Sequence, residues 1–271
     1  MKNRDWIILA ISLLLFPTTL WAQTVVLVHG FQGNGMDWRE DGITQTLQQQ
    51  GFVDGGDLIF TPRGIYNPLP TAVFPTKPAR MVYTLELPPR APILQQAQWL
   101  NLYLQQIYAQ RQEPLTLVGH SAGGLVARSW LVQYASVPVD TLITIATPHL
   151  GTPRANMASA ATNTPMTLLA EAMGFNEWTE EAQDLYRDMR TEEPGRFLYW
   201  LNHQPHPAIR YVAVARDDKP RPDQFDFVVP TYSQNMNNVF ALAGKAEYWV
   251  SGDGHSLDSE DGLLLARLLS R

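Results

Sequence analysis

The sequence of 271 residues contains no cysteine. This absence excludes thiol catalysis, thiolate metal sites and disulfides, so the core alone must stabilise the fold. Charged residues make up only 17% of the chain, and the net charge is -6. Such a chain lacks the basic footprint of a nucleic-acid-binding protein, and its acidity disfavours electrostatic docking to anionic lipid.

Long apolar runs are scarce, and the main one lies at the N-terminus. Two basic residues precede an apolar run at 6–16, and Leu20-Trp21-Ala22 can end a cleavable segment. This layout predicts a secretory signal peptide over residues 1–22, because the run is short for a bilayer span. An uncleaved anchor is the alternative, since Leu20 is less typical than alanine at its position. We therefore expect an exported protein, periplasmic or secreted, without a membrane span after cleavage.

The remaining segment, residues 23–271, is long enough for one substantial α/β domain. It contains no internal repeat and no second domain boundary. Buried strands are expected at 24–28, 115–118 and 141–146, with helical patterns at 37–50 and 94–111 between them. Such alternation predicts a mainly parallel central sheet with helices on both faces. The sequence leaves the oligomeric state open.

Two segments interrupt this alternation. Residues 62–92 are rich in proline and show little periodicity, so we expect a long loop there. Residues 154–206 are too long for a simple connection and predict a helical insertion, either a lid or an ordinary small subdomain. If the insertion walls a site for an apolar substrate, its candidate residues are Phe175, Trp178 and Trp200. Ordinary packing of these aromatic residues is the alternative interpretation.

Ser121 is the most informative residue of the chain. It lies in Gly119-His120-Ser121-Ala122-Gly123, between the apolar segment 115–118 and a helical pattern at 125–134. A strand, an abrupt turn and a helix with serine at the apex form the nucleophile-elbow layout. The glycines avoid collision with the neighbouring strand and helix, and the helix N-terminus favours developing negative charge. A glycine-rich turn that only permits close packing is the alternative.

A second glycine-rich loop follows the strand expected at 24–28. Its sequence, His29-Gly30-Phe31-Gln32-Gly33, suits a loop that supplies a backbone N–H to an oxyanion hole. A flexible connection without function is the alternative. The joint occurrence of this loop and the elbow favours the functional interpretation.

A serine nucleophile needs a histidine base and an acid, and in this layout the chain order is serine, acid, histidine. His255 follows the strand expected at 247–250 and is the only histidine after residue 226. It is therefore the candidate base. Asp217 and Asp218 come directly after the strand expected at 209–215, and Asp223 and Asp226 lie later in the same loop, so the acid has several candidates.

The ordered motifs resemble those of α/β-hydrolase lipases and esterases, in particular bacterial ones. They are Val26-Leu27-Val28-His29-Gly30-Phe31, the elbow with Gly124-Leu125-Val126-Ala127-Arg128, and Thr147-Pro148-His149-Leu150-Gly151-Thr152. The resemblance implies the α/β-hydrolase fold and favours Asp226 as the acid, because Asp226-Phe227-Val228-Val229-Pro230 is similar to the family's Asp-Gly-Val-Val-Pro stretch. It also implies that Phe31 and Ala122 donate the N–H groups of the oxyanion hole.

These features together predict an exported serine hydrolase that cleaves carboxylic esters, of lipids or of smaller molecules, through Ser121, His255 and Asp226. An acyltransferase with the same acyl-enzyme and a non-catalytic binding protein on this fold are the alternatives. We expect no cofactor. His203 and His206 lack a nearby carboxylate cluster and are weak metal-ligand candidates, and no calcium loop is recognisable although some related lipases bind calcium.

Overall fold

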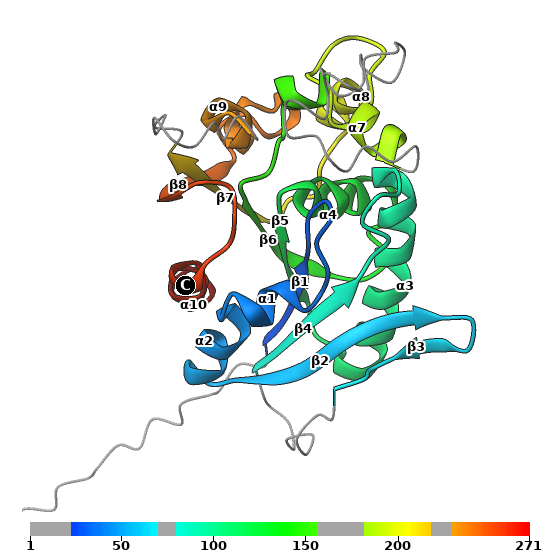
Figure 1. Cartoon of the computed structure of the whole chain (residues 1–271), viewed down its shortest axis with the longest axis vertical. Helices are drawn as coiled ribbons and strands as arrows, with labels where there is room; N and C mark the ends of the chain where they lie inside the picture. The colour runs from blue at the N-terminus through cyan, green and yellow to red at the C-terminus, as the bar shows by residue number, and fades with distance from the viewer. Residues whose placement is uncertain (1–22, 70–79, 157–181, 218–228) are drawn as a thin grey trace, which may run out of the picture.

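A sheet of mainly parallel strands organises the molecule (Figure 1). The computed structural model describes residues 23–69, 80–156, 182–217 and 229–271. The strands are β1 (Gln23–Val28), β2 (Phe52–Thr61), β3 (Gly64–Tyr66), β4 (Arg80–Glu86), β5 (Leu115–His120), β6 (Val139–Ile145), β7 (Arg210–Asp217) and β8 (Ala246–Asp253). Their order in the sheet is β3-β2-β4-β1-β5-β6-β7-β8. Only the β2–β3 pair among these described strands is antiparallel.

The central strands are apolar without alternation because both of their faces are covered. All residues of β1 after the first are buried, and five of the six residues of β5 are buried. A strand enclosed on both sides has no solvent face on which polar residues would alternate. The expected fold class, a mainly parallel sheet between helical layers, is therefore confirmed.

Helices cover the two faces of the sheet, and the sheet separates two core clusters (Figure 1). The helices are α1 (Asp37–Glu40), α2 (Ile43–Gln49), α3 (Ile93–Arg111), α4 (Ala122–Gln133), α7 (Gln183–Asp188), α8 (Phe197–His203), α9 (Thr231–Gln234) and α10 (Ser259–Leu269), with the short 3-10 helices η2 (Met236–Asn238) and η3 (Phe240–Leu242). Side chains of α3, α4, α7 and α8 pack in one core cluster. Those of α1, α2 and α10 pack in the other.

The prediction of a structureless loop at 62–92 is wrong within the described residues. Strand β4 lies in this segment and pairs in parallel with both β1 and β2, so it is an interior strand of the sheet. The short strand β3 also falls there. The helix expected at 37–50 is two helices, because Gly42 between them has φ 76°, a left-handed conformation that ends α1.

Of the insertion expected at 154–206, the described part contains α7 and α8. Phe175 and Trp178 lie outside the described residues. Trp200 in α8 is 38% exposed and its ring lies 5.9 Å from that of Phe197. The signal-peptide segment 1–22 also lies outside the described residues.

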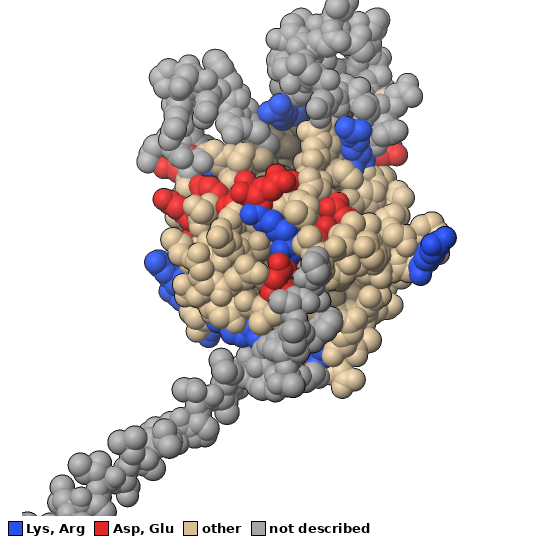
Figure 2. Space-filling view, turned by 60° about the horizontal axis from the view of Figure 1, so that its bottom comes forward, with Lys and Arg blue, Asp and Glu red and all other residues tan. Residues whose placement is uncertain are grey.

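The helices and the surface charge of the described residues bear on whether the protein binds membranes or nucleic acids. None of the helices in the described ranges combines the length and the apolar character that a membrane span requires. On the face drawn in Figure 2, acidic and basic side chains are interspersed over a largely uncharged surface. The described part of this face therefore presents no continuous basic patch.

Candidate active site

Ser121 occupies a strained backbone conformation between β5 and α4. Its φ of 50° and ψ of -125° lie outside the usual regions for a residue with a side chain. Two hydrogen bonds hold the strained turn: the Ser121 N–H donates to Ile145 O at 2.8 Å, and the Gly124 N–H donates to Ser121 O at 3.1 Å. The side chain keeps 8% exposure at the start of α4. This is the geometry of a nucleophile elbow.

The glycines around Ser121 are required by close backbone approach. A Cβ on Gly119 would lie 2.5 Å from the Gly124 backbone in α4. A Cβ on Gly123 would lie 2.4 Å from the carbonyl oxygens of Val28 and His29 at the end of β1. The predicted collisions with the neighbouring helix and strand are thus confirmed, and the elbow packs directly against the loop that follows β1.

The structure brings His255 to Ser121 across 134 residues of sequence. His255 follows β8, and its Nε2 lies 2.9 Å from Ser121 Oγ. Burial lowers the pKa of His255 to about 3, with further lowering by His120, Arg216 and Arg154. His255 is therefore neutral at pH 7, and its Nε2 can accept the hydrogen bond that Ser121 Oγ–H donates. A neutral imidazole in this position can act as a general base.

His120, next to the serine, supports the His255 backbone instead of joining the chemistry. Its Nε2–H donates to His255 O at 2.9 Å, and the two rings lie 5.3 Å apart. Burial lowers the pKa of His120 to about 4, so the ring is neutral and the donor at Nε2 fixes its tautomer. The rings of His120 and of Trp38 in α1 form a T-shaped pair, with 6.4 Å between the ring centroids.

The glycine-rich loop after β1 lies against the elbow. A Cβ on Gly30 would come within 2.9 Å of Ser121 Cβ. His29 ties this loop to the end of β4: its Nε2 accepts from Leu87 N at 3.0 Å, while Nδ1–H donates to Gly30 O at 2.9 Å. Phe31 packs edge-on against Tyr186 in α7 at 5.1 Å. Ala122 is the first residue of α4.

Comparison with known proteins agrees with this architecture. A family model of a PGAP1-like alpha/beta domain matches residues 91–169, which run from α3 past β6. No curated protein matches the sequence. Among solved structures, the mature lipase BlEst2 of Bacillus licheniformis gives a TM-score of 0.61 at 18% identity, over 92% of this chain and 91% of that chain. The chain has the α/β-hydrolase fold.

Two further structures support this assignment. A metagenomic carboxyl esterase gives a TM-score of 0.55 at 13% identity, over 91% of this chain and 74% of that chain. A protein from Listeria innocua gives 0.54 at 18% identity, over 86% and 85%. At these identities the likeness is one of fold, and it confirms at that level the resemblance inferred from the motifs.

Of the candidates for the acid, only Asp217 lies within the described residues. Asp217 is the last residue of β7 and pairs in register with Asp253 of β8, the strand that leads to His255. Asp218 and Asp226 lie outside the described residues. The choice among Asp226, Asp217 and Asp218 therefore stays a prediction.

The histidines assigned no catalytic role have structural partners. His149 is fully buried and lies 3.1 Å from Arg128 Nη1 through Nδ1, and 3.0 Å from Thr144 Oγ1 through Nε2. His206 Nε2 accepts from Arg128 Nη2 at 3.2 Å. His203 instead stacks on Phe240, with ring centroids 4.8 Å apart. His203 and His206 thus contact different partners.

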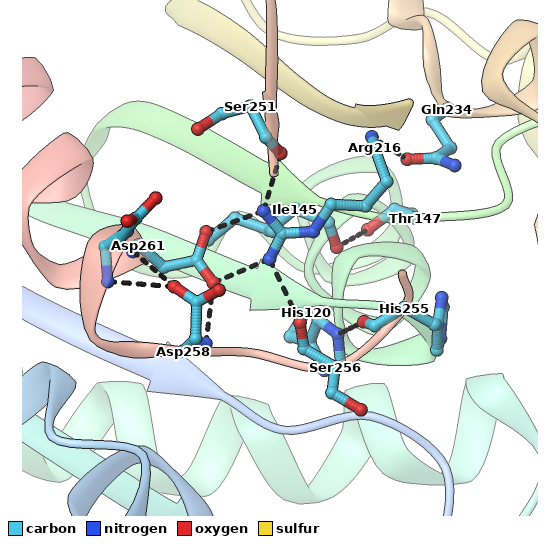
Figure 3. Close-up of polar contacts among 11 residues, drawn as sticks. His120, Ile145, Thr147, Arg216, Gln234, Ser251, His255, Ser256, Asp258 and Asp261 are labelled. Carbon is cyan, nitrogen blue, oxygen red and sulfur yellow. Dashed lines mark hydrogen bonds and ion pairs between the residues drawn. The ribbon is translucent and has the colours of Figure 1, made fainter. Parts of the chain in front are cut away.

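Two charged residues near the site were missed by sequence reasoning. Arg216 in β7 and Asp261 in α10 form an ion pair in which the side chains are 4% and 1% exposed. Arg216 also bonds to the backbone beside His255, as Figure 3 shows. No local motif marks either residue, since the two are 45 positions apart.

Proposed function

We propose that this protein is a serine hydrolase that cleaves carboxylic esters, with Ser121 as nucleophile and His255 as general base. The observation that carries the proposal is the 2.9 Å contact between Ser121 Oγ and the Nε2 of a neutral His255. The strained elbow and the glycine-rich loop packed against it support the same role for Ser121.

In the proposed reaction, Ser121 Oγ attacks the ester carbonyl as its proton passes to His255 Nε2. The N–H groups of Phe31 and Ala122 would stabilise the negative charge on the carbonyl oxygen; Ala122 begins α4, whose N-terminus also favours that charge. His255 then protonates the leaving alcohol, which gives an acyl-enzyme. Water attacks this ester as its proton passes to His255, and Ser121 leaves with that proton.

Asp226 is our proposed acid, which would orient His255 and stabilise its protonated form. Asp217 and Asp218 are the alternatives. The three variants Asp226→Asn, Asp217→Asn and Asp218→Asn separate these assignments when kcat is measured under one set of conditions. The acid is the residue whose amide variant loses about 10⁴-fold in kcat, the loss known for an isosteric change of a triad aspartate. If Asp226→Asn keeps its kcat, Asp226 is not the acid.

The proposed substrate class rests on the fold relatives and on an exposed aromatic residue of the segment 154–206. A lipase and a carboxyl esterase share this fold at low identity, and the partly exposed Trp200 of α8 offers an apolar surface. We propose an ester substrate with an apolar acyl group. A series of p-nitrophenyl esters of increasing chain length tests this: a preference for long chains indicates a lipase, and a preference for short chains an esterase.

Ser121→Ala tests the central assignment. The variant removes only Oγ, so it is expected to keep the melting temperature of the wild type and lose p-nitrophenyl ester hydrolysis and fluorophosphonate labelling. Hydrolysis that persists at the wild-type rate in the folded variant would disprove the role of Ser121. Labelling of the wild type without turnover of any ester would instead favour the acyltransferase alternative, which an added alcohol acceptor can test.

We also propose that the protein is exported, on the basis of the N-terminal pattern at residues 1–22. The first strand begins at Gln23, whose side chain accepts from Arg80 and donates to Leu269 O. Cleavage after Ala22 would therefore leave β1 complete. Recovery of the full-length chain only from the cytoplasm of its host would contradict export.

A further inference from the structure

The loop that carries His255 runs from Gly254 to Asp258, between β8 and α10. Its apolar anchor is Leu257, which is buried in the core cluster that includes α10, whereas Ser256, next to His255, is exposed. A general base must keep its geometry within about 0.5 Å to remain effective. Whatever fixes the backbone of this loop therefore fixes the distance between His255 Nε2 and Ser121 Oγ.

One guanidinium group holds the chain on both sides of His255. Arg216 Nη1 donates to Ser251 O at 2.7 Å, and Arg216 Nη2 donates to Ser256 O at 3.3 Å (Figure 3). The first carbonyl lies four residues before His255 and the second lies one residue after it. The same group thus spans the last residues of β8 and the loop as far as Ser256.

Arg216 is itself fixed at three further points. Its Nη1 and Nη2 donate to the two carboxylate oxygens of Asp261 at 2.8 and 2.6 Å, a bidentate pair in the interior. Its backbone N–H donates to Gln234 Oε1, and its carbonyl accepts from Thr231 Oγ1. Both α9 and α10 are therefore tied to the residue that holds the His255 loop.

Asp261 connects this pair to the helix that follows the loop. Its carboxylate accepts from the Asp258 N–H, and its own N–H donates to the Asp258 side chain, which together form a capping box at the start of α10. The ion pair therefore fixes the start of α10 and the loop before it as one unit.

Gly252 makes room for the guanidinium. It has φ 73°, and a Cβ at this position would lie 2.8 Å from Arg216 Nη1. Only glycine combines this left-handed conformation with such close approach at low cost. The backbone of β8 is thus shaped locally around the Arg216 side chain.

We propose that the Arg216–Asp261 pair is a positioning device for His255, which holds the β8–α10 loop so that Nε2 stays within hydrogen-bonding distance of Ser121 Oγ. The inference rests on the proposed function, because positioning matters only if His255 is the base. Neither residue reaches Ser121 through a contact of its own, so both act through the loop.

The charges of the pair also act on His255. His120 on β5, Arg216 on β7 and Arg154 after β6 each lower the pKa of His255, in addition to burial. Asp261 on α10 carries the opposite charge and pairs with Arg216, so we expect its carboxylate to offset part of the effect of Arg216. Loss of the Arg216 charge should therefore raise the pKa of His255, and loss of the Asp261 charge should lower it further.

The test compares Arg216→Gln, Asp261→Asn and the double variant Arg216→Gln/Asp261→Asn with the wild type. Each is assayed with a p-nitrophenyl ester as a pH profile, normalised to active sites titrated with a fluorophosphonate. We expect kcat to fall about 10- to 100-fold, as for misplacement of a catalytic group by up to 1 Å, with KM changed less than about 3-fold. The acid limb should move to higher pH in Arg216→Gln and to lower pH in Asp261→Asn.

The double variant keeps the test valid if a single variant does not fold. It removes both charges together, and so leaves no unpaired buried charge. Its acid limb should lie between those of the single variants, while its kcat stays low because Ser251 O and Ser256 O have lost their donor. Arg216→Lys keeps the charge without the planar bidentate group, so it should retain the acid limb and lose most of kcat.

Arg210 provides the matched control on the same strand. It bonds to Glu247 of β8 through Nε at 2.8 Å and to Leu268 O of α10 through Nη1 at 2.8 Å, at the opposite end of β7. Arg210→Gln should lower the melting temperature and leave kcat and the acid limb unchanged.

A double variant that folds and keeps kcat within about 2-fold of the wild type would overturn the positioning role. If Ser121→Ala is inactive in the same assay, an unchanged kcat of the double variant contradicts only the role of the Arg216–Asp261 pair. If Ser121→Ala is active, the proposed function itself has failed.

Discussion

Gly123→Ala is the sharpest perturbation of the contact between the elbow and the loop after β1. The new Cβ would lie 2.4 Å from the carbonyl oxygens of Val28 and His29, and real Cβ atoms essentially never come within 3.0 Å of such atoms. The end of β1 must therefore retreat from α4 by at least 0.6 Å. Because Gly30 packs on Ser121, the retreat also displaces the proposed oxyanion donor at Phe31.

The size of the effect follows from this displacement. Overpacking of a tight contact destabilises a protein by about 1–3 kcal/mol, which lowers the melting temperature of a domain of this size by about 2–12 °C. A shift of 0.6 Å exceeds the tolerance of about 0.5 Å for a catalytic group. We therefore expect kcat for a p-nitrophenyl ester to fall by about 10- to 100-fold, measured per titrated active site beside a thermal melt.

Gly244→Ala is the control for backbone strain without a collision. Gly244 has φ 71° and nothing within 4 Å of its would-be Cβ, and it precedes β8 at the strand end opposite to His255. Its substitution should destabilise the fold by about 1–2 kcal/mol and leave kcat unchanged. A wild-type kcat in Gly123→Ala, or an equal loss of activity in Gly244→Ala, would show that the contact between α4 and the end of β1 does not set the geometry of the site.

Four further predictions follow from the histidines and the N-terminus. Because burial lowers the pKa of His255 to about 3, the acid limb of kcat/KM should lie well below pH 6.5, and a limb at 6.5 or above would contradict this. Burial and, to a smaller extent, Arg128 lower the pKa of His206 to about 4, and the pKa of His149 is also lowered. Between pH 6.5 and about 4, only the unfolded chain takes up these protons. The free energy of unfolding, measured with urea, should therefore decrease as the pH falls through this window. Removal of the Arg128 charge by Arg128→Met should raise the pKa of His206, as NMR titration of its ring would show. N-terminal sequencing of the exported protein should begin at Gln23, whereas a start at Met1 would indicate an uncleaved anchor.

The elbow and His255 could be predicted because their chemistry imposes a local pattern. Tight turns require glycine at particular positions, and the order of serine and histidine along the chain follows from the topology of the sheet. The two sequence features that carried the prediction, the turn at Ser121 and the lone late histidine, are those that meet at 2.9 Å. The acid has no comparable local requirement, and several candidates remain.

Strand β4 was missed because proline dominated the interpretation of its segment. Arg80–Glu86 contains no proline, and its five central residues are buried. Its composition, with valine, tyrosine, threonine and leucine, is typical of a strand. A narrower window, confined to the residues between the prolines, would have indicated it.

Helix phase shows a second limit of sequence patterns. The pattern at 94–111 predicts the helix α3, but its buried face starts at Ile93, while Leu94 is 41% exposed. Periodicity gives the length of a helix more reliably than which of two adjacent apolar residues faces the core. That choice depends on the partner helix α4, which the local sequence does not contain.

The loops of the candidate site are held by buried polar side chains, which hydrophobic patterning does not reveal. His29 fixes the glycine-rich loop through Leu87 N, His120 fixes the carbonyl of His255, and Arg216 holds the carbonyls on either side of it. The need for such contacts is physical: loops beyond the ends of strands have backbone groups without ladder partners, and buried ones must be satisfied by side chains. His29 Nε2 and His255 Nε2 both function as acceptors, and each loses that role on protonation. Burial keeps both rings neutral, so the same desolvation that leaves His255 Nε2 unprotonated also preserves the loop on which the substrate carbonyl would rest.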